Sequence, residues 1–465
     1  MEDFDEDSLV YIARYFNRDF ISVSNLRNRQ DGKFVTKIRK KSLEIMGGEG
    51  IRLEEKGLFY VGSVDFMVAR KDGERNFVVL ETNGGSGRGL LSLTSGQTEL
   101  IFSGYKGAID QNCDLDDGEK KFILIGALPN DALFQEKIML VEYLKKRFKM
   151  EGYKSSVYNT FTFNPSNIGE EEDIIFILSN YNNINEHLSY RNNHMTFKGK
   201  EIDVVIGDGV ARRFPIIGAH VKRDWKKLET IIVNPVYQIS DDKANTYLAV
   251  EKGYDRLKKY RIDRLEFARI NDPFNLERRI EDILTRASKN YILKPFGGSG
   301  GVGIQPIIPP GSRENAEEII EKSITEYYQK FDSRRNIFPY TIQEMANFEI
   351  IEWNNSKRTF DVRIYLVQKD GKLIPAGGEG RIAPLPYKGN YEKEEFVVNL
   401  TGYGGVEIER AIAFSEKGLK TLNLQEEDLI DMFCAACETF NAITQNFTDI
   451  VNFKHWDSLK LEGNI

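Results

Sequence analysis

A glycine-rich segment stands between two short apolar runs at residues 291–308. The first run, YILK, ends at Lys294, and the second run, IQPII, follows the segment GGSGGVG. Glycine lets backbone N–H groups converge on phosphate oxygens with no Cβ in the way, and Lys294 would add a fixed positive charge. Strand, glycine loop and strand therefore predict a hairpin folded over a polyphosphate. The loop residues expected to contact it are Gly298, Ser299, Gly300 and Gly301.

Two other glycine motifs do not account for this loop. Gly298, Gly300 and Gly303 fit the dinucleotide pattern G-x-G-x-x-G, but that motif must open a helix. Here a β-branched run with prolines follows, and the chain contains no G-K-[ST] for a P-loop. A surface hairpin without a ligand stays open as the alternative interpretation.

Composition excludes several classes of protein. The 465 residues are enough for about three domains, and 41% hydrophobic with 29% charged residues is ordinary for a globular protein. A net charge of −7 without a basic block argues against nucleic acid or an anionic membrane as the main partner. The acidic start does not resemble a secretory leader, and no apolar run approaches the ~20 residues of a membrane span. We therefore expect a cytoplasmic protein.

The cysteines offer little chemistry. Three cysteines are too few for a disulfide framework, and Cys113 and the four histidines lack the spacing of metal ligands. Cys434 and Cys437 stand three residues apart within a helical pattern, so we expect them to pack in the core.

The chain divides into three segments by its patterns. Residues 1–118 contain two strands around the turn K-D-G-E-R, residues 119–237 alternate strands and helices as in a mostly parallel sheet, and residues 238–465 contain the glycine hairpin within 285–345. A long hairpin is expected over 359–383 with Asp370-Gly371 as its turn, another strand over 394–401, and strand-like runs near the C-terminus at FTDIVNF and SLKLEGNI.

Further residues fall in a recognisable order around the glycine loop. Lys243 stands in D-D-K at the start of a helix, Q-E-M (Gln343, Glu344 and Met345) follows the third helix, and Asp361 and Arg363 share a strand. Arg381 and Asn399 follow in G-G-E-G-R-I-A-P and V-V-N-L-T. With Lys294, this order over about residues 230–405 resembles the ATP-grasp family. The resemblance implies two α/β subdomains that grip ATP, with adenine near Gln343–Met345.

Magnesium ligands are implied at the N-terminal hairpin. ATP-grasp enzymes hold Mg²⁺ with an acidic residue on one strand and E-x-N on the next, and Asp65 followed by Glu81-Thr82-Asn83 fits this pattern. Glu81 and Asn83 would face the same side of a strand, and Mg²⁺ prefers such oxygen ligands. A hairpin that precedes the other motifs resembles circularly permuted ATP-grasp ligases of the glutathione synthetase and glutathionylspermidine synthetase type. The middle segment would then be a Rossmann-like pre-ATP-grasp domain.

A second acid and E-x-N set lies at the C-terminus. Asp449 precedes Glu462 and Asn464, which is the unpermuted position. We favour the N-terminal set because the permuted order explains why the chain needs residues 1–115. The C-terminal set stays open as the alternative metal site.

The resemblance assigns roles to the remaining residues. Lys243 and Lys294 would hold the α- and β-phosphates, and Arg381 and Arg363, with Asn399, would meet the γ-phosphate or an acyl phosphate. Arg88, in the glycine-rich segment after Asn83, could hold the substrate carboxylate.

The expected activity is ATP-dependent ligation of a carboxylate to an amine through an acyl phosphate, with release of ADP and phosphate. The substrates would be small molecules, such as an amino acid or short peptide and an amine. A small-molecule kinase and a non-catalytic ATP-binding protein are the alternatives, and a homodimer is left open.

Overall fold

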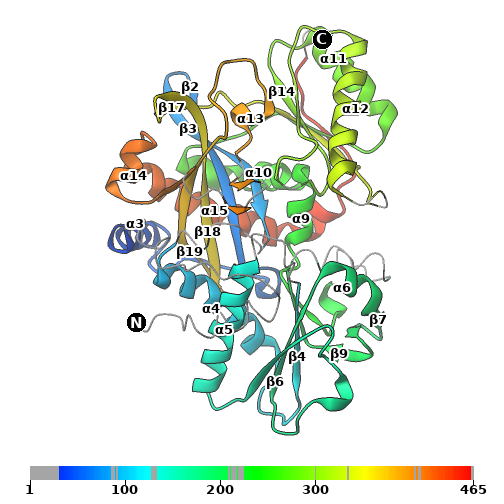
Figure 1. Ribbon diagram of the computed structural model, residues 1–465. Helices are drawn as coiled ribbons and strands as arrows, with labels where there is room; N and C mark the ends of the chain where they lie inside the picture. The colour runs from blue at the N-terminus through cyan, green and yellow to red at the C-terminus, as the bar shows by residue number, and fades with distance from the viewer. Residues whose placement is uncertain are drawn as a thin grey trace.

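The computed structural model describes residues 31–84, 90, 93–126, 134–207, 210, 217, 225–298, 300–331, 333, 335–398, 400–402, 405–406 and 410–461. Within these residues the chain forms an eight-stranded sheet, two five-stranded sheets and two small sheets, with helices packed around them (Figure 1). The expected mixed α/β class is confirmed.

The eight-stranded sheet, called the central sheet below, contains strands from both the N-terminal and the C-terminal parts of the chain. Its strand order is β1-β19-β18-β2-β3-β12, with β17 on β18 and β22 on β19. Its members are β1 (Ile51–Arg52), β2 (Val61–Lys71), β3 (Glu74–Asn83), β12 (Ile262–Asp263), β17 (Ile350–Trp353), β18 (Ser356–Lys369), β19 (Lys372–Ile382) and β22 (Ala411–Ala413). The N-terminal hairpin β2–β3 therefore lies directly beside the C-terminal hairpin β18–β19.

Both hairpins close with the turns that their sequences predict. Asp72 and Gly73 have φ values of 52° and 84°, and Asp370 and Gly371 have 51° and 76°. Two consecutive residues with positive φ match the twist of the flanking strands, which is why Asp-Gly favours this turn. The first turn sets the register of β2 on β3, so that Asp65 lies opposite Glu81. Asp65 also lies opposite Arg363 through the pairing of β2 with β18.

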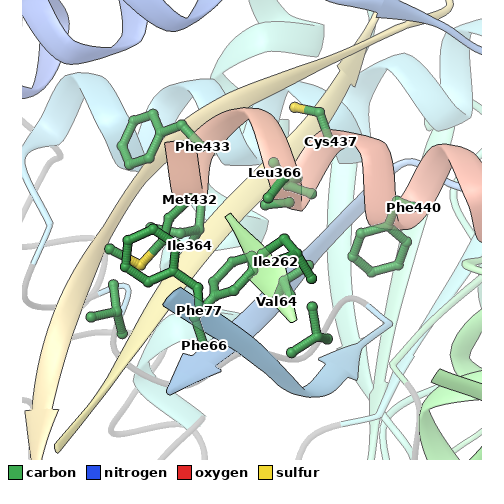
Figure 2. Packing of buried hydrophobic residues seen from close by; sticks show 14 of the residues in the cluster. Val64, Phe66, Phe77, Ile262, Ile364, Leu366, Met432, Phe433, Cys437 and Phe440 are labelled. Atoms are coloured by element: carbon green, nitrogen blue, oxygen red, sulfur yellow. The ribbon is translucent and has the colours of Figure 1, made fainter. Parts of the chain in front are cut away.

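One face of the central sheet is apolar. Side chains at alternate positions of β2 and β18, such as Val64, Phe66 and Ile364, are fully buried. They pack against α15 (Glu426–Gln445), which contributes Phe433 and Phe440 (Figure 2). Cys434 and Cys437 belong to the same cluster, so their expected role in core packing is confirmed.

The opposite face changes character along the strands. At one end Val61, Tyr365 and Val367 pack with α4 (Ser95–Asn112) in a second core cluster. Farther along, the same face carries Asp65 and Arg363, since side chains repeat every two residues in a strand. This face carries the candidate site.

The second sheet is parallel throughout. Its order is β11-β10-β4-β6-β5, and every neighbouring pair in it runs parallel. The strands are β4 (Lys121–Gly126), β5 (Ser155–Asn159), β6 (Ile174–Ser179), β10 (Val204–Ile206) and β11 (Ile231–Val233), with α5 (Phe134–Met150) and α6 (Tyr181–His187) as helices. A small sheet of β7 (Leu188–Arg191), β8 (His194–Phe197) and β9 (Lys200–Ile202) stands between β6 and β10. The alternation of strands and helices in the sequence thus predicted the parallel sheet, but it did not predict the small inserted sheet.

The third sheet is antiparallel and carries the glycine loop. Its order is β15-β14-β16-β13-β23, from β13 (Phe267–Ile270), β14 (Tyr291–Lys294), β15 (Gln305–Ile307), β16 (Tyr340–Glu344) and β23 (Trp456–Asp457). Helices α11 (Pro273–Arg286) and α12 (Arg313–Lys330) are packed with it. In Figure 1 this sheet and the parallel sheet lie at opposite ends of the molecule, at the top and bottom of the view.

Two of the remaining elements are helices where the sequence predicted strands. The remaining elements are α3 (Gly32–Ile45), α9 (Tyr237–Asp241), α10 (Lys243–Leu257), α13 (Lys393–Phe396), α14 (Glu416–Thr421), α16 (Phe447–Val451), β20 (Thr401–Gly402) and β21 (Gly405–Val406). The strand expected over 394–401 begins as the helical turn α13, and the strand expected at FTDIVNF is the helix α16. In α16 the buried residues are Phe447 and Ile450, and a spacing of three places both on one face of a helix.

Among the described residues, no helix is long and apolar enough to cross a membrane.

Candidate functional site

The glycine loop adopts the backbone that only glycine adopts readily. Gly297, Gly300, Gly301 and Gly303 have φ values between 61° and 76°, a region that side chains with a Cβ rarely enter. Ser299 lies outside the described residues. The loop therefore has the conformation expected from its composition.

Lys294 ends β14 in a buried position. Its side chain is 9% exposed, and its Nζ donates a hydrogen bond to the Tyr247 hydroxyl at 2.7 Å. Burial lowers the pKa of Lys294 to about 7 against the opposing effect of Glu81, with a smaller contribution from the nearby Lys243. A buried ammonium with a hydroxyl as its hydrogen-bond partner is poorly compensated, so the site favours an incoming anion.

Tyr247 connects the lysine to the expected adenine region. Its hydroxyl is hydrogen-bonded to Gln343 Oε1 and lies 2.7 Å from the Leu80 carbonyl oxygen. Tyr247 stands four residues after Lys243 on α10, and this spacing places both on one helix face. The sequence analysis missed Tyr247, although this spacing from Lys243 was the available signal.

The Gln343 amide is incompletely bonded. Its Nε2 is buried and has no hydrogen-bond partner among the residues that the structure describes. The two residues after it are engaged locally: Glu344 forms an ion pair with Lys289 at 2.8 Å, and the Met345 N–H donates to the Asn290 carbonyl at 2.8 Å. Gln343 is thus the member of Q-E-M with an unused donor.

Lys243 pairs with the N-terminal hairpin. Its Nζ lies 2.8 Å from Glu81 Oε2. The start of its helix is tied to the third sheet, because Asp242 accepts from Arg269 at 2.9 Å and the Gly297 N–H donates to the Asp241 carbonyl at 2.8 Å. The two lysines, Glu81 and the glycine loop therefore meet where the central and third sheets approach.

A buried charge network continues across the central sheet. Arg363 donates to both carboxylate oxygens of Asp65 at 2.6 Å, and Arg381 donates to Asp65 at 2.7 Å. Arg381 also donates hydrogen bonds to both carboxylate oxygens of Asp361, from Nε at 2.7 Å and from Nη2 at 2.6 Å. Burial opposes ionisation of Asp65, but the two arginines outweigh it and hold the pKa of that carboxyl well below its usual range. We call Asp65, Asp361, Arg363 and Arg381 the arginine–aspartate network.

This network bears on the expected Mg²⁺ ligands. Both oxygens of Asp65 already accept hydrogen bonds from arginine, so Asp65 does not fit the role of a metal ligand in this arrangement. The described residues also contain no group of three or more His, Cys, Asp or Glu side chains placed to hold a metal ion. Glu81 and Asn83 stay a prediction as ligands, but the three residues do not fit Mg²⁺ as a set.

The alternative metal set is placed elsewhere. Asp449 lies on α16 with its side chain 68% exposed, and it pairs with Lys252 at 3.1 Å. Glu462 and Asn464 lie outside the described residues, as do Arg88 and Asn399. The structure therefore brings Lys243, Glu81 and the arginine–aspartate network together, and places Asp449 in a solvent-exposed ion pair.

Asn234 joins the parallel sheet to this region. It follows β11 and is fully buried. Its side chain accepts from the Tyr60 N–H at 2.6 Å and donates to the Gly84 carbonyl at 2.6 Å. These bonds fix both the entry of β2 and the exit of β3 beside Asn83.

Comparison with known proteins gives distant structural likeness. No protein-family model matches the sequence, and no curated protein matches it. A glutathione synthetase-like effector from Globodera pallida is similar with a TM-score of 0.38 and 14% identity, over 81% of this chain and 84% of that chain. D-alanyl-alanine synthetase A from Vibrio cholerae is similar with a TM-score of 0.30 and 11% identity, over 68% and 81%. Likeness at this level does not establish the family of this chain.

Proposed function

We propose that the protein binds ATP between the glycine loop and the central sheet and uses it to join a carboxylate to an amine. The observation that carries this proposal is Lys294, a buried cation beside Lys243 and a loop of positive-φ glycines. The partly buried Lys243 repels the buried Lys294 ammonium, and a polyphosphate would relieve that repulsion. The motif order supports an ATP-grasp enzyme of the circularly permuted type, with the parallel sheet as its Rossmann-like domain.

ATP fits the residues that surround Lys294. Lys294 and Lys243 would hold the phosphates, the loop N–H groups would cover them, and Gln343 Nε2 would donate to the base. Tyr247 would orient the Lys294 ammonium through its 2.7 Å hydrogen bond. Each of these groups is in place before the nucleotide arrives, which reduces the reorganisation needed on binding.

The arginines suit the chemical step. A substrate carboxylate attacks the γ-phosphorus and ADP leaves; an amine then attacks the acyl carbon and phosphate leaves. Arg363 and Arg381 would stabilise the negative charge on the transferred group by their fixed positive charge. Catalysis would rest on positioning and electrostatics, and no step is assigned to a metal.

The test is ADP release with a panel of amino acids, short peptides and polyamines, with mass spectrometry of the products. Amide formation with amine-dependent ADP release supports the ligase. A phosphorylated product without an amide would favour the kinase, and ATP binding without ADP release would favour a nucleotide-binding protein. A folded protein that does not bind ATP overturns all three.

A further inference from the structure

Helix α12 holds the far end of the glycine loop. Glu326 Oε2 accepts a hydrogen bond from the Gly303 N–H at 3.2 Å, and Glu326 Oε1 accepts one from Gln305 Nε2 at 2.9 Å. Ser323, three residues earlier on the helix, donates its hydroxyl to the Gly303 carbonyl. Residues three apart lie side by side on a helix, so both backbone groups of Gly303 are bonded to one face of α12.

The same glutamate also contacts an element attached to the central sheet. Lys393 Nζ, from α13, lies 2.6 Å from Glu326 Oε2. The helical turn α13 is fixed to β18, because the Thr359 hydroxyl donates to the Glu395 carbonyl at 2.7 Å. This strand also carries Arg363 of the arginine–aspartate network. Glu326 therefore bonds the glycine loop on one side and the central sheet's own segment on the other.

A second contact joins the loop backbone to the same segment. Gly301 has a φ of 76°, and a Cβ built on it would lie 2.5 Å from Val397 Cγ1 and 3.6 Å from Lys393 Cε. The loop thus packs directly on the segment that carries Lys393, at a distance that only glycine allows. The start of the loop is bonded separately, from the Gly297 N–H to the Asp241 carbonyl. The contacts at Gly301 and Lys393 therefore hold the part of the loop that this first bond does not.

The ion pair between Lys393 and Glu326 is formed at neutral pH and can break at small cost. Burial opposes ionisation of Glu326. The contacts to Lys393, Gln305 and the Gly303 N–H outweigh burial and lower the pKa of this carboxyl. The side chains of Lys393 and Glu326 are 19% and 26% exposed, so water reaches the pair and weakens its attraction. A contact of this kind can hold a loop and still open reversibly.

We propose that Glu326 is a positioning residue of the glycine loop and that its ion pair with Lys393, called the latch below, opens when nucleotide leaves. The loop carries the N–H groups that would cover the phosphates, so its position decides how easily a nucleotide escapes. Glu326 and Lys393 act through Gly303 and Gly301 and are not assigned a contact with ATP. This inference rests on the proposed ATP site and adds the control of nucleotide exchange.

The first experiment measures nucleotide release by displacing a fluorescent ATP analogue from the full chain with excess ATP. Lys393→Met keeps the length of the side chain, and Glu326→Gln keeps an acceptor for the loop N–H, so both variants remove the ion pair. We expect each to raise the dissociation rate about two- to fivefold, the size of one partly exposed ion pair. The double variant should be no faster than Glu326→Gln alone, because both changes remove the same interaction. Effects that multiply in the double variant would show that the two residues act separately and would overturn the latch.

The second experiment needs no nucleotide and so separates the latch from the proposed function. Hydrogen exchange of peptides that cover residues 297–305 is compared in the wild type, in Lys393→Met and in Lys388→Met, which changes an exposed lysine of the same segment and is the matched control. Exchange should rise in Lys393→Met alone, with an unchanged melting temperature.

The outcomes distinguish the two proposals. If exchange rises in Lys393→Met but the folded wild type does not bind ATP, the positioning of the loop by this pair is confirmed and the proposed function fails. If exchange and nucleotide release both keep their wild-type values in Lys393→Met, the latch is wrong while the ATP site stands. Faster exchange throughout the chain with a lower melting temperature would give the ion pair a general structural role and overturn the latch.

Discussion

The two faces of the central sheet are built from the same strands, but they differ sharply around Asp65 and Arg363. Phe66 and Ile364 face α15 in a fully apolar cluster, whereas their neighbours Asp65 and Arg363 face the other side as a buried ion pair. Apolar packing stabilises the fold through area removed from water. A buried ion pair is costly to desolvate and is weak evidence for stability. The contrast teaches that one face stabilises the fold by burial, whereas the other carries charges at a cost in stability that the proposed ATP site would explain.

The largest expected effect comes from removing the shared carboxylate. Asp65→Ala leaves the buried Arg363 without its carboxylate partner in the network and leaves Arg381 with Asp361 alone, so we expect the free energy of unfolding to fall by about 3–5 kcal/mol. Urea denaturation measures this change. The double variant Asp65→Leu with Arg363→Met should recover much of the stability, because it replaces a charge pair with apolar groups. A loss below about 1 kcal/mol for the single variant would mean that the network does not behave as a buried one.

The next effect concerns nucleotide affinity. Lys294→Met removes the buried ammonium but keeps a side chain of similar length, so we expect ATP affinity to fall about 100-fold, or about 2.7 kcal/mol. Unfolding stability should be unchanged or higher because a buried charge is lost. Equilibrium binding of ATP and a denaturation curve test both parts. A folded variant that keeps wild-type ATP affinity would contradict the site.

A smaller effect should follow pH. The pKa of Lys294 is lowered to about 7 by burial, and the protonated form binds phosphate. Affinity for ATP should therefore be highest below this pKa and fall as pH rises through it, by up to about tenfold per pH unit. Lys294→Arg stays charged at every pH and should remove this dependence. The measurement is ATP affinity from about pH 7 to about pH 9 for the wild type and for Lys294→Arg. If affinity falls with pH equally in both proteins, Lys294 is not the titrating group.

The smallest effect sharpens the contrast between faces. Ile364→Val removes one methylene from the apolar face, between Arg363 and Tyr365 in the chain. We expect a loss of about 0.5–1.5 kcal/mol in unfolding stability and ATP affinity within about twofold of wild type. Chemical denaturation and ATP titration are the measurements. A large loss of ATP affinity would show that the two faces are coupled.

Residue types and local spacing were sufficient to locate much of the candidate site, which stays a prediction. Lys294 ends a short apolar run before glycines, and Lys243 opens a helix after D-D, so both could be located from neighbouring residues. The Asp-Gly turns likewise predicted both long hairpins, because turn chemistry is local.

The partners of these residues could not be predicted in the same way. Asp65 matches the pattern of a metal ligand, but its hydrogen bonds to Arg363 and Arg381 depend on the pairing of β2 with β18. Gln97 has ordinary sequence surroundings, and it lies over Gly377 only because α4 packs over β19. The strand expected over 394–401 failed for a different reason: Phe396, Val397 and Val398 favour a strand locally, whereas Glu394 and Glu395 lie in the first turn of α13, where acidic residues favour a helix.

The pairing of β2 with β18 also has a consequence for synthesis on the ribosome. The two strands are about 300 residues apart, since Asp65 and Arg363 are separated by 298 positions. Until residues 356–369 emerge, β2 has an open edge, and such edges pair readily with other chains. Its apolar face stays uncovered for longer, until α15 is made. Contacts of this sequence separation form slowly. We expect nascent chains that stop before β18 to depend on chaperones, and fragments truncated there to aggregate.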